Sequence, residues 1–313
     1  MKAWILDGAH HELRFEERLV PAPGPGQVLV KVTASGLCHS DVGYMEGTMP
    51  FLTEPPIILG HEAAGTIAAL GEGVTGWEVG DGVVSATDAD DAPGVTRDGA
   101  YAEYMIANVD RLVRLPEGID WSQAATATDA GMTSHAAVVA YGKVQPGEKV
   151  LIVGLGGLGM VAAQIAIAKG AEVYGAEPRE AGRRAALALG FQDAVANAAE
   201  YAGRGFDAAL DFAGFGTTTT AAMAATKNGG RVVLVGMGKP EWTIRSFDLV
   251  MRPLTLQGAT PTGRVEHLQD VIDMVMAGQI KVQAEEITFE EIPEGLERLR
   301  RGEVQGRLVA RFA

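Results

Sequence analysis

The fold is decided by the stretch Lys149-Val-Leu-Ile-Val153-Gly154-Leu-Gly156-Gly157-Leu158-Gly159. Its first residues predict a buried strand, its glycines predict a tight turn, and Met160–Ala168 predicts a helix of small apolar residues. From Val150 to Ala168 no residue is charged, so the segment is long enough to resemble a membrane span. The interior glycines favour instead a strand, a turn and a helix that are buried on both sides.

The glycine spacing at this turn is typical of a loop that binds the pyrophosphate of a dinucleotide. Gly154 would make the turn, Gly156 would let the backbone approach the phosphates, and Gly159 would pack the helix against the strand. Glu177 follows the next predicted strand, where a carboxylate accepts hydrogen bonds from ribose hydroxyls and repels a 2′-phosphate. NAD is therefore favoured over NADP, a preference that Arg179, Arg183 and Arg184 would weaken by attracting that phosphate. A glycine-rich helix entry beside a solvated glutamate is the alternative interpretation.

On both sides of this loop the pattern indicates two domains. After Asp129, strands alternate with helices, which is typical of a parallel sheet covered by helices. The expected strands are Lys149–Val153, Glu172–Ala176, Ala208–Ala213, Arg231–Gly236 and Leu254–Gly258, and the expected helices are Leu158–Lys169, Arg179–Leu189 and Thr218–Thr226. Before residue 115, short β-rich runs predict a barrel or a sandwich: Val28–Thr33, Gly65–Leu70, Val83-Val84 and Tyr101–Ile106. The tail predicts helices near Val265–Ala277 and Ile292–Arg300 and a strand at Arg307–Phe312.

Composition excludes several classes of function. With 313 residues, 47% of them hydrophobic, the chain can bury two cores, and its 41 glycines indicate many tight turns. The net charge of −14 has no balancing basic tract, which argues against nucleic acids and anionic membrane surfaces as partners. A single cysteine, Cys38, excludes an internal disulfide, and the N-terminus lacks a signal-peptide pattern. We therefore expect a cytoplasmic globular protein.

Four potential metal ligands occur in settings marked by glycine. They are Cys38, His61, Glu62 and Asp129. A catalytic zinc ion needs about three protein ligands and one open position, and Cys38, His61 and Asp129 would supply sulfur, nitrogen and oxygen. Asp41 would accept a hydrogen bond from the other ring nitrogen of His61. Because the ligands are far apart in the sequence, a buried cysteine, a core histidine and a helix-capping aspartate explain them equally well.

Taken together, these motifs resemble the zinc-dependent alcohol dehydrogenases of the medium-chain dehydrogenase/reductase superfamily. The resemblance rests on Gly36–Asp41, Gly60–Gly65, Gly71–Gly82, Gly99–Tyr104 and Gly154–Gly159, and spans nearly the whole chain. It implies a GroES-like β-barrel catalytic domain, residues 1–129 completed by 262–313, and an α/β Rossmann domain, residues 130–261. It also implies a homo-oligomer, either a dimer or a tetramer.

The resemblance assigns roles residue by residue. Cys38, His61 and Asp129 fall on the catalytic zinc ligands, and Glu62 on an acidic residue beside the zinc. Ser40 falls on the hydroxyl that passes a proton from the substrate. The implied cofactor-binding residues are His39, Thr133, Gly154, Gly156, Gly157, Leu158, Gly159, Glu177, Val235 and Arg307, of which Arg307 resembles an arginine that reaches the pyrophosphate.

Two departures from the family pattern stand out. The stretch Ser85–Asp98 lacks the four cysteines of the family's structural-zinc lobe, which excludes a structural zinc there. Gly43 replaces a histidine that ends the proton relay in some relatives, so the proton would leave through a ribose hydroxyl, His39 or water.

The implied activity is reversible hydride transfer between an alcohol and NAD, giving an aldehyde or a ketone, with one catalytic zinc per chain. Three alternatives stay open at this point: a zinc-free quinone or enoyl reductase of the same superfamily, a polyol dehydrogenase, and a nucleotide-binding redox sensor without turnover. The expected partner is a small-molecule alcohol, aldehyde or ketone.

Overall fold

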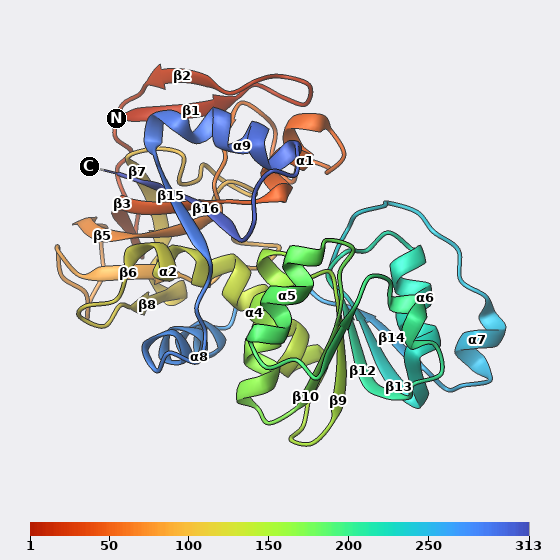
Figure 1. Cartoon of the computed structure of the whole chain (residues 1–313). Coiled ribbons are helices and arrows are strands. Elements are labelled where there is room, and N and C mark those ends of the chain that lie inside the picture. The colour runs from red at the N-terminus through yellow and green to blue at the C-terminus, as the bar shows by residue number, and fades with distance from the viewer. Residues whose placement is uncertain (313) are drawn as a thin grey trace. The chain divides into compact units, whose positions relative to one another are not determined.

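The computed structural model describes residues 1–312, which form two compact units. The first unit contains Met1–Met132, Pro261–Ala277 and the residues from Lys281 onward. The second contains Thr133–Thr260 and the short return Gly278–Ile280. Both ends of the chain therefore belong to the first unit, where red and blue ribbons lie together in Figure 1.

The first unit is built on a seven-stranded sheet and a three-stranded sheet. The larger has the order β15-β16-β3-β5-β6-β8, with β7 also paired to β3, and the smaller has the order β2-β1-β4. The strands are β1 (Lys2–Leu6), β2 (Arg14–Glu17), β3 (Gln27–Leu37), β4 (Ile57–Ile58), β5 (Glu62–Leu70), β6 (Gly82–Ser85), β7 (Tyr104–Asn108), β8 (Leu112–Arg114), β15 (Ala284–Thr288) and β16 (Arg307–Arg311). Strand β3 contacts β5, β7 and β16, so its last residues lie deep inside the unit.

Helices pack around these sheets, and α1 (His39–Glu46) and α9 (Ile292–Arg300) contribute to an apolar core. Two more are α2 (Trp121–Thr126) and α8 (Val265–Met276), with 3₁₀ turns η1 (Val109–Arg111) and η5 (Phe289–Glu291). Helix α9 buries Ile292, Leu296 and Leu299, which share one helical face because they are four and three residues apart. That face joins a core with Leu37 and Tyr101, and Figure 1 shows α9 beside α1.

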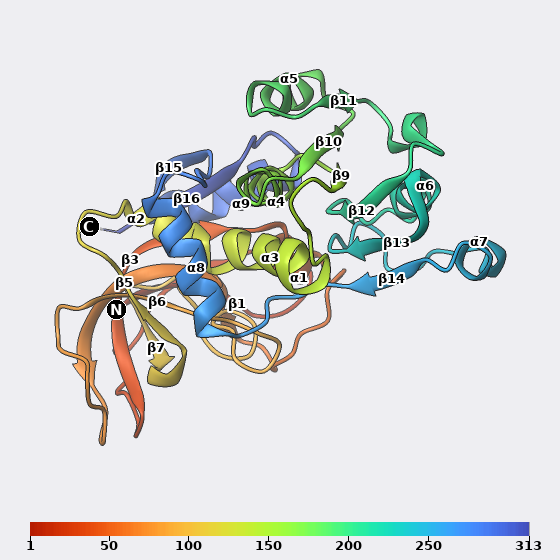
Figure 2. The same ribbon diagram turned by 90° about the horizontal axis from the view of Figure 1, so that it is seen from below.

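The second unit is a parallel six-stranded sheet in the order β11-β10-β9-β12-β13-β14, which Figure 2 shows in sequence from α5 to α7. Its strands are β9 (Lys149–Val153), β10 (Glu172–Ala176), β11 (Asp193–Val195), β12 (Phe206–Asp211), β13 (Thr226–Leu234) and β14 (Thr255–Gly258). Its helices are α3 (Met132–His135), α4 (Gly157–Ala168), α5 (Glu180–Ala188), α6 (Thr217–Ala225) and α7 (Ser246–Val250), with the 3₁₀ turn η4 (Ala198–Tyr201). Strand order reverses beside β9, where such sheets bind dinucleotides.

The predicted fold class, a β-barrel domain with a doubly wound parallel sheet, is confirmed. The uncharged stretch from Val150 to Ala168 divides into β9, the glycine turn and α4. No helix within residues 1–312 is both long and apolar enough to cross a membrane.

Some expected elements differ in the structure. The run Tyr101–Ile106 becomes a strand only at Tyr104, because the backbone of Tyr101 instead bonds to Leu59 and Trp4. Residues 130–139, which follow Asp129 and have a helical sequence pattern, are interrupted by two π-helical turns, η2 (Ala127–Gly131) and η3 (Ala136–Tyr141). Strand β13 begins at Thr226, five residues before the predicted start at Arg231.

Candidate functional site

Strand register brings the ends of three neighbouring strands to one place in the first unit. On one side of β3, Gly36 is paired with Glu62 of β5; on the other, Leu37 is paired with Leu308 of β16. Cys38 follows the end of β3, His61 precedes β5, and Arg307 begins β16. Residues separated by more than two hundred positions in the sequence are therefore neighbours here.

The four predicted ligands lie together in this region. Each of Cys38, His61, Glu62 and Asp129 offers a ligand atom, and these atoms all lie within 4.8 Å of one another. Asp129 Oδ2 is 3.6 Å from Cys38 Sγ and 3.7 Å from His61 Nε2. Two ligands bound to one zinc at a tetrahedral angle are about 3.3–3.5 Å apart. Asp129 Oδ2 is therefore within about 0.4 Å of the separation from Cys38 and from His61 that a tetrahedral zinc ion requires.

Asp129 reaches this cluster from the π-helical turn η2, so it is not the helix-capping residue that the alternative interpretation supposed. A π-helical turn inserts one extra residue into a helix and commonly marks a functional site. Thr128, the preceding residue, anchors the turn, since its hydroxyl donates to Ala125 O and accepts from the amide of Ala63.

Asp41 connects two of the ligands. Its side chain is fully buried, and Oδ1 lies 3.4 Å from His61 Nδ1, so the predicted partners are neighbours although no hydrogen bond joins these two atoms. Oδ2 accepts the backbone N–H of Cys38 at 3.0 Å and the hydroxyl of Tyr101 at 2.7 Å. Asp41 also stabilises the N-terminus of α1, because it is the third residue of the helix and forms a capping box with the N-cap residue Cys38.

Arg307 supplies a buried positive charge to the same cluster. Its guanidinium lies 3.0 Å from Glu62 Oε1 and 3.3 Å from Asp129 Oδ2, and its side chain is only 4% exposed. The residue that sequence resemblance assigned to the cofactor pyrophosphate thus contacts two of the candidate metal ligands in this structure.

Burial and charge shift the proton affinities of the cluster. Burial works to lower the pKa of His61, but the carboxylates of Asp41 and Asp129 outweigh it and raise that pKa well above its ordinary value. Burial raises the pKa of Glu62 far above normal against the pull of Arg307. Burial also works to raise the pKa of Asp129, yet His61 and Arg307 lower it. For the Cys38 thiol, burial is again opposed by Arg307, and the pKa is lowered.

This donor set fits a zinc ion. One thiolate, one imidazole and one carboxylate carry a charge of −2, which a divalent cation neutralises, and Glu62 is balanced by Arg307. Three of the four residues are buried and Asp129 is half-buried, so a bound cation would be held in surroundings where its electrostatic effect is strong. Such an arrangement can polarise an oxygen bound at an open position.

In the second unit, the glycine loop has the shape that the sequence predicted. Gly154 adopts a φ of +85°, which favours glycine. A Cβ at Gly159 would lie 1.9 Å from Gly154 O, so helix α4 can approach β9 only with glycine there. A Cβ at Gly156 would meet nothing within 4 Å. The loop thus leaves open space beside Gly156 at the N-terminus of α4, where backbone amides and the helix dipole attract phosphate.

Glu177 lies directly after β10 and is bound to that loop. Its Oε2 accepts the amide of Leu155 at 3.0 Å, and its Oε1 accepts Arg179 Nε at 2.7 Å. Burial works to raise the pKa of Glu177, but the hydrogen bonds from Arg179 and Leu155 lower it, so the carboxylate stays charged. The predicted ribose-binding acid is therefore beside the predicted phosphate loop, with Arg179 already paired to it.

The remaining predicted residues occupy several environments. Ser40 places Oγ 3.5 Å from Cys38 Sγ, while His39, the first residue of α1, is exposed. In the second unit Thr133 is buried, and Leu158 and Val235 are half-buried. Leu158 O accepts the hydroxyl of Ser134, and the amide of Val235 donates to Asp211 O. Their proximity to a nicotinamide stays a prediction.

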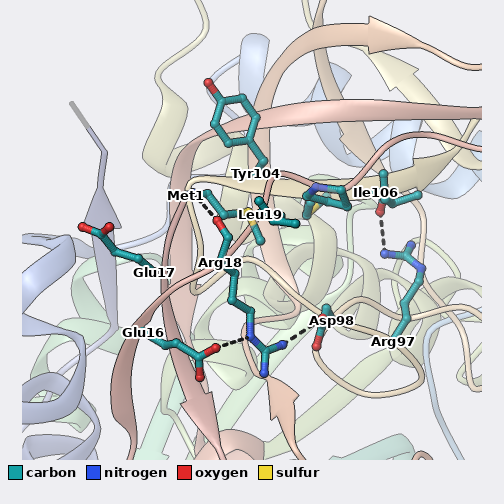
Figure 3. A pocket seen from close by; sticks show the side chains of 11 residues that line it. Met1, Glu16, Glu17, Arg18, Leu19, Arg97, Asp98, Tyr104 and Ile106 are labelled. Carbon is teal, nitrogen blue, oxygen red and sulfur yellow. Dashed lines mark hydrogen bonds and ion pairs between the residues drawn. The ribbon is translucent and has the colours of Figure 1, made fainter.

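A surface pocket of about 600 Å³ in the first unit contains none of these residues (Figure 3). Its lining includes Arg18, which pairs with Glu16 and Asp98, and Arg97, which donates to Ile106 O. These charged groups already have partners within the pocket wall or beside it, and we assign this pocket no role.

Sequence reasoning missed two residues of the metal-ligand cluster's surroundings. Tyr101 was expected only as part of a strand, yet its hydroxyl bonds to Asp41. Gly36 was quoted only as part of a motif, although a Cβ there would lie 2.1 Å from Glu62 Oε2. The motif around Tyr101 and the motif around Gly36 can be recognised in the sequence, but their contacts with Asp41 and Glu62 cannot.

Comparisons with known proteins agree with both halves of this description. Residues 24–117 match the family described as alcohol dehydrogenase GroES-like domain, and residues 157–277 match the one described as zinc-binding dehydrogenase. An alcohol dehydrogenase from Moraxella sp. is 32% identical over 99% of this chain and 98% of its own length. One from Geobacillus stearothermophilus is 31% identical over 99% of both chains.

Solved structures give the same result. An acetophenone reductase from Geotrichum candidum, solved in complex with NAD, is 30% identical with a TM-score of 0.92, covering 99% of this chain and 97% of that one. An alcohol dehydrogenase from the archaeon Aeropyrum pernix is 29% identical with a TM-score of 0.92 over the whole of both chains.

Proposed function

Because the chain belongs to the alcohol dehydrogenases of the medium-chain dehydrogenase/reductase superfamily, and so is an NAD-dependent oxidoreductase, we propose that it is a zinc enzyme with one catalytic ion per chain. The observation that carries this proposal is the convergence of Cys38, His61 and Asp129, whose donor atoms have the spacing of tetrahedral ligands. Glu62 is an additional candidate ligand, because its buried carboxylate lies in the same cluster, where it pairs with Arg307.

A zinc ion bound there would act as a Lewis acid that lowers the pKa of an alcohol hydroxyl. The chain's own residues prepare the site for that role. Cys38 and Asp129 supply negative charge, and Asp41, with Oδ1 3.4 Å from His61 Nδ1, would orient the His61 ring in the metal-bound site. Bound NAD would supply the nicotinamide that takes up the hydride, and the protein would contribute position and electrostatics.

Ser40 is the residue we propose to receive the hydroxyl proton of the alcohol. Its Oγ lies 3.5 Å from Cys38 Sγ and is partly exposed, so it is close to a ligand and also accessible to solvent. A hydroxyl can accept one proton while donating its own, which suits a relay. Gly43 offers no side chain to continue this path, and the exposed ring of His39 is the adjacent titratable group.

For the cofactor, we propose that the loop Gly154–Gly159 binds the pyrophosphate of NAD and that Glu177 binds the adenosine ribose. The open space beside Gly156 and the charged state of Glu177 support this assignment. A 2′-phosphate would be repelled by Glu177, whose pairing with Arg179 already reduces the positive charge available to NADP.

We propose a secondary alcohol and its ketone as substrates. The similar Geotrichum protein is an acetophenone reductase, so 1-phenylethanol and acetophenone are the first pair to test. The loop after α1 carries the half-buried apolar side chains of Met49 and Phe51, which would suit such a substrate better than a polyol.

The test combines metal content with turnover. Elemental mass spectrometry should find about one zinc per purified chain, and that protein should oxidise 1-phenylethanol with NAD. Asp129→Asn should lose metal and activity together, whereas Asp90→Asn, which changes an exposed aspartate, should lose neither. A metal-free wild-type chain that reduces quinones or activated double bonds would contradict the zinc proposal and favour a zinc-free reductase.

We also propose that the chain forms a homo-oligomer through β14. This strand is the last of the six-stranded sheet, and most of it is exposed. Phe247, Val250 and Met251, which precede it, are exposed by more than 60%. An exposed edge beside apolar side chains favours pairing with a second copy. Val250→Lys should lower the mass measured by light scattering, and Leu19→Lys, at an exposed apolar residue of the first unit, should leave it unchanged.

A further inference from the structure

Tyr101 lies one layer behind the candidate zinc ligands and contacts none of them through its hydroxyl. The side chain is completely buried, and its hydroxyl donates to Asp41 Oδ2 at 2.7 Å. The same oxygen accepts the amide of Cys38, and the other oxygen of Asp41 faces His61 Nδ1. One carboxylate therefore links the backbone of one ligand to the ring of another, and Tyr101 is its remaining hydrogen-bond donor in this arrangement.

The backbone of Tyr101 is also attached to the segment that carries His61. Its amide donates to Leu59 O, and the amide of Ala100 donates to Gly60 O. Its ring lies against Gly60, where a Cβ would be 2.6 Å from Tyr101 Cδ1. Gly60 has a φ of +93°, so the chain turns sharply just before His61. Tyr101 thus contacts both the main chain before His61 and the Asp41 carboxylate, which lies behind the His61 ring.

From this geometry we propose that Tyr101 is a positioning residue for the metal site, which acts by holding the Asp41 carboxylate in the rotation that serves His61 and Cys38 together. The inference rests on the proposed zinc site. A carboxylate has two oxygens that rotate together, so the hydrogen bond to Oδ2 determines where Oδ1 points. Groups that orient ligands in this way typically change metal affinity or activity by about 10–100-fold when removed.

The hydroxyl of Tyr101 is a permanent donor. Burial and the neighbouring Asp41 raise its pKa well above the ordinary value, so it keeps its proton throughout the range in which the enzyme would work. A phenylalanine at this position would fill the same space and leave Asp41 Oδ2 with the Cys38 amide as its donor. The substitution Tyr101→Phe therefore removes the orienting contact with little change in packing.

The test compares Tyr101→Phe with the wild type and with Tyr201→Phe, which removes a buried hydroxyl in the second unit. Zinc release to a coloured chelator measures how firmly the ligands are held, and the absorption spectrum of the cobalt-substituted protein reports ligand geometry. We expect Tyr101→Phe to bind one metal ion, to release it about 10-fold faster and to shift the cobalt bands. Tyr201→Phe should match the wild type in both readouts.

Two results would overturn the inference in distinguishable ways. If the wild type binds zinc and Tyr101→Phe has the same release rate and spectrum, the hydroxyl only satisfies its own burial, and the proposed function stands. If the wild type binds no metal at all, the proposed zinc site fails and the role of Tyr101 fails with it. If Tyr101→Phe does not fold, Tyr101→Met, which also lacks the hydroxyl, takes its place and is tested by the same zinc-release and cobalt-absorption measurements.

Discussion

The buried guanidinium of Arg307 makes a prediction that can be worked out from the structure. Replacing it with methionine removes the positive charge that lies 3.0 Å from Glu62 and 3.3 Å from Asp129. The pKa of Asp129 is lowered in part by Arg307, so this carboxylate stays charged and would be left without that partner. Removing one member of a buried ion pair typically costs about 3–5 kcal/mol in the free energy of unfolding. We expect Arg307→Met to destabilise the metal-free first unit by this amount.

The cost should depend on Asp129. In the double variant Arg307→Met with Asp129→Asn, the charged carboxylate is replaced by a neutral amide of similar size, so the charge that needed a partner is gone. The double variant should therefore be more stable than the sum of the two single losses predicts, by about 2 kcal/mol or more. Arg311→Met, on the same strand, breaks a pair with Glu286 that is partly exposed, and should cost less than about 1 kcal/mol.

Urea unfolding at pH 7 can measure these differences in the first unit alone. Three of the four tryptophans, Trp4, Trp77 and Trp121, belong to the first unit, so fluorescence in a Trp242→Phe background reports on it. The reasoning would be refuted by simple additivity of the two single losses, because the ion pair would then contribute no coupling. It would also be refuted if Arg307→Met lowered the free energy of unfolding no more than Arg311→Met does.

Three further predictions concern the cofactor loop and the proton path. Gly159→Ala should destabilise the second unit by about 1–3 kcal/mol, because the new Cβ would overlap the backbone oxygen of Gly154. Gly156→Ala should be as stable as the wild type, yet it should bind NADH at least 10-fold more weakly in a fluorescence titration. The pKa of Glu177 is lowered on folding, so its stabilising contribution is complete above about pH 4.5 and is lost as the pH falls. The free energy of unfolding of Glu177→Gln should therefore differ from that of the wild type more at pH 7 than at pH 4. Ser40→Ala should retain zinc and lower kcat by at least 10-fold, and an unchanged kcat would exclude Ser40 from the proton path.

The second unit was predictable because its signals are local. Strand β9, the glycine loop and α4 follow one another directly, and each is recognisable within about ten residues. The prediction was poorer where elements are short or depend on distant partners. Strand β4 has two residues, Ile57 and Ile58, and exists because it pairs with β1, which no local pattern shows. The π-helical turn at Asp129 likewise has the sequence pattern of an ordinary helix.

The ligand set was predictable for a different reason, and its surroundings were not. Cysteine, histidine and acidic residues beside glycines suggest a metal whatever the fold, so Cys38, His61 and Asp129 could be proposed as candidates from their chemistry, while the family resemblance favoured them over core residues and placed Glu62 beside them. Arg307 could be assigned only by resemblance, because its neighbours depend on strand register. A shift of one residue between β3 and β16 would turn its side chain to the opposite face of the sheet.

Gly36 shows how that register limits the sequence. It lies inside β3, where glycine is normally unfavourable because it loses more backbone freedom than other residues and packs no side chain. Its partner across the sheet is Glu62, and a Cβ at Gly36 would lie 2.1 Å from Oε2 and 2.8 Å from Cδ of that side chain. The space above Gly36 is therefore the space that the Glu62 carboxylate occupies between β3 and Arg307. An alanine at this position would force Glu62 to move, either toward the metal ligands or away from Arg307, so the glycine is a requirement of the buried ion pair rather than of the strand.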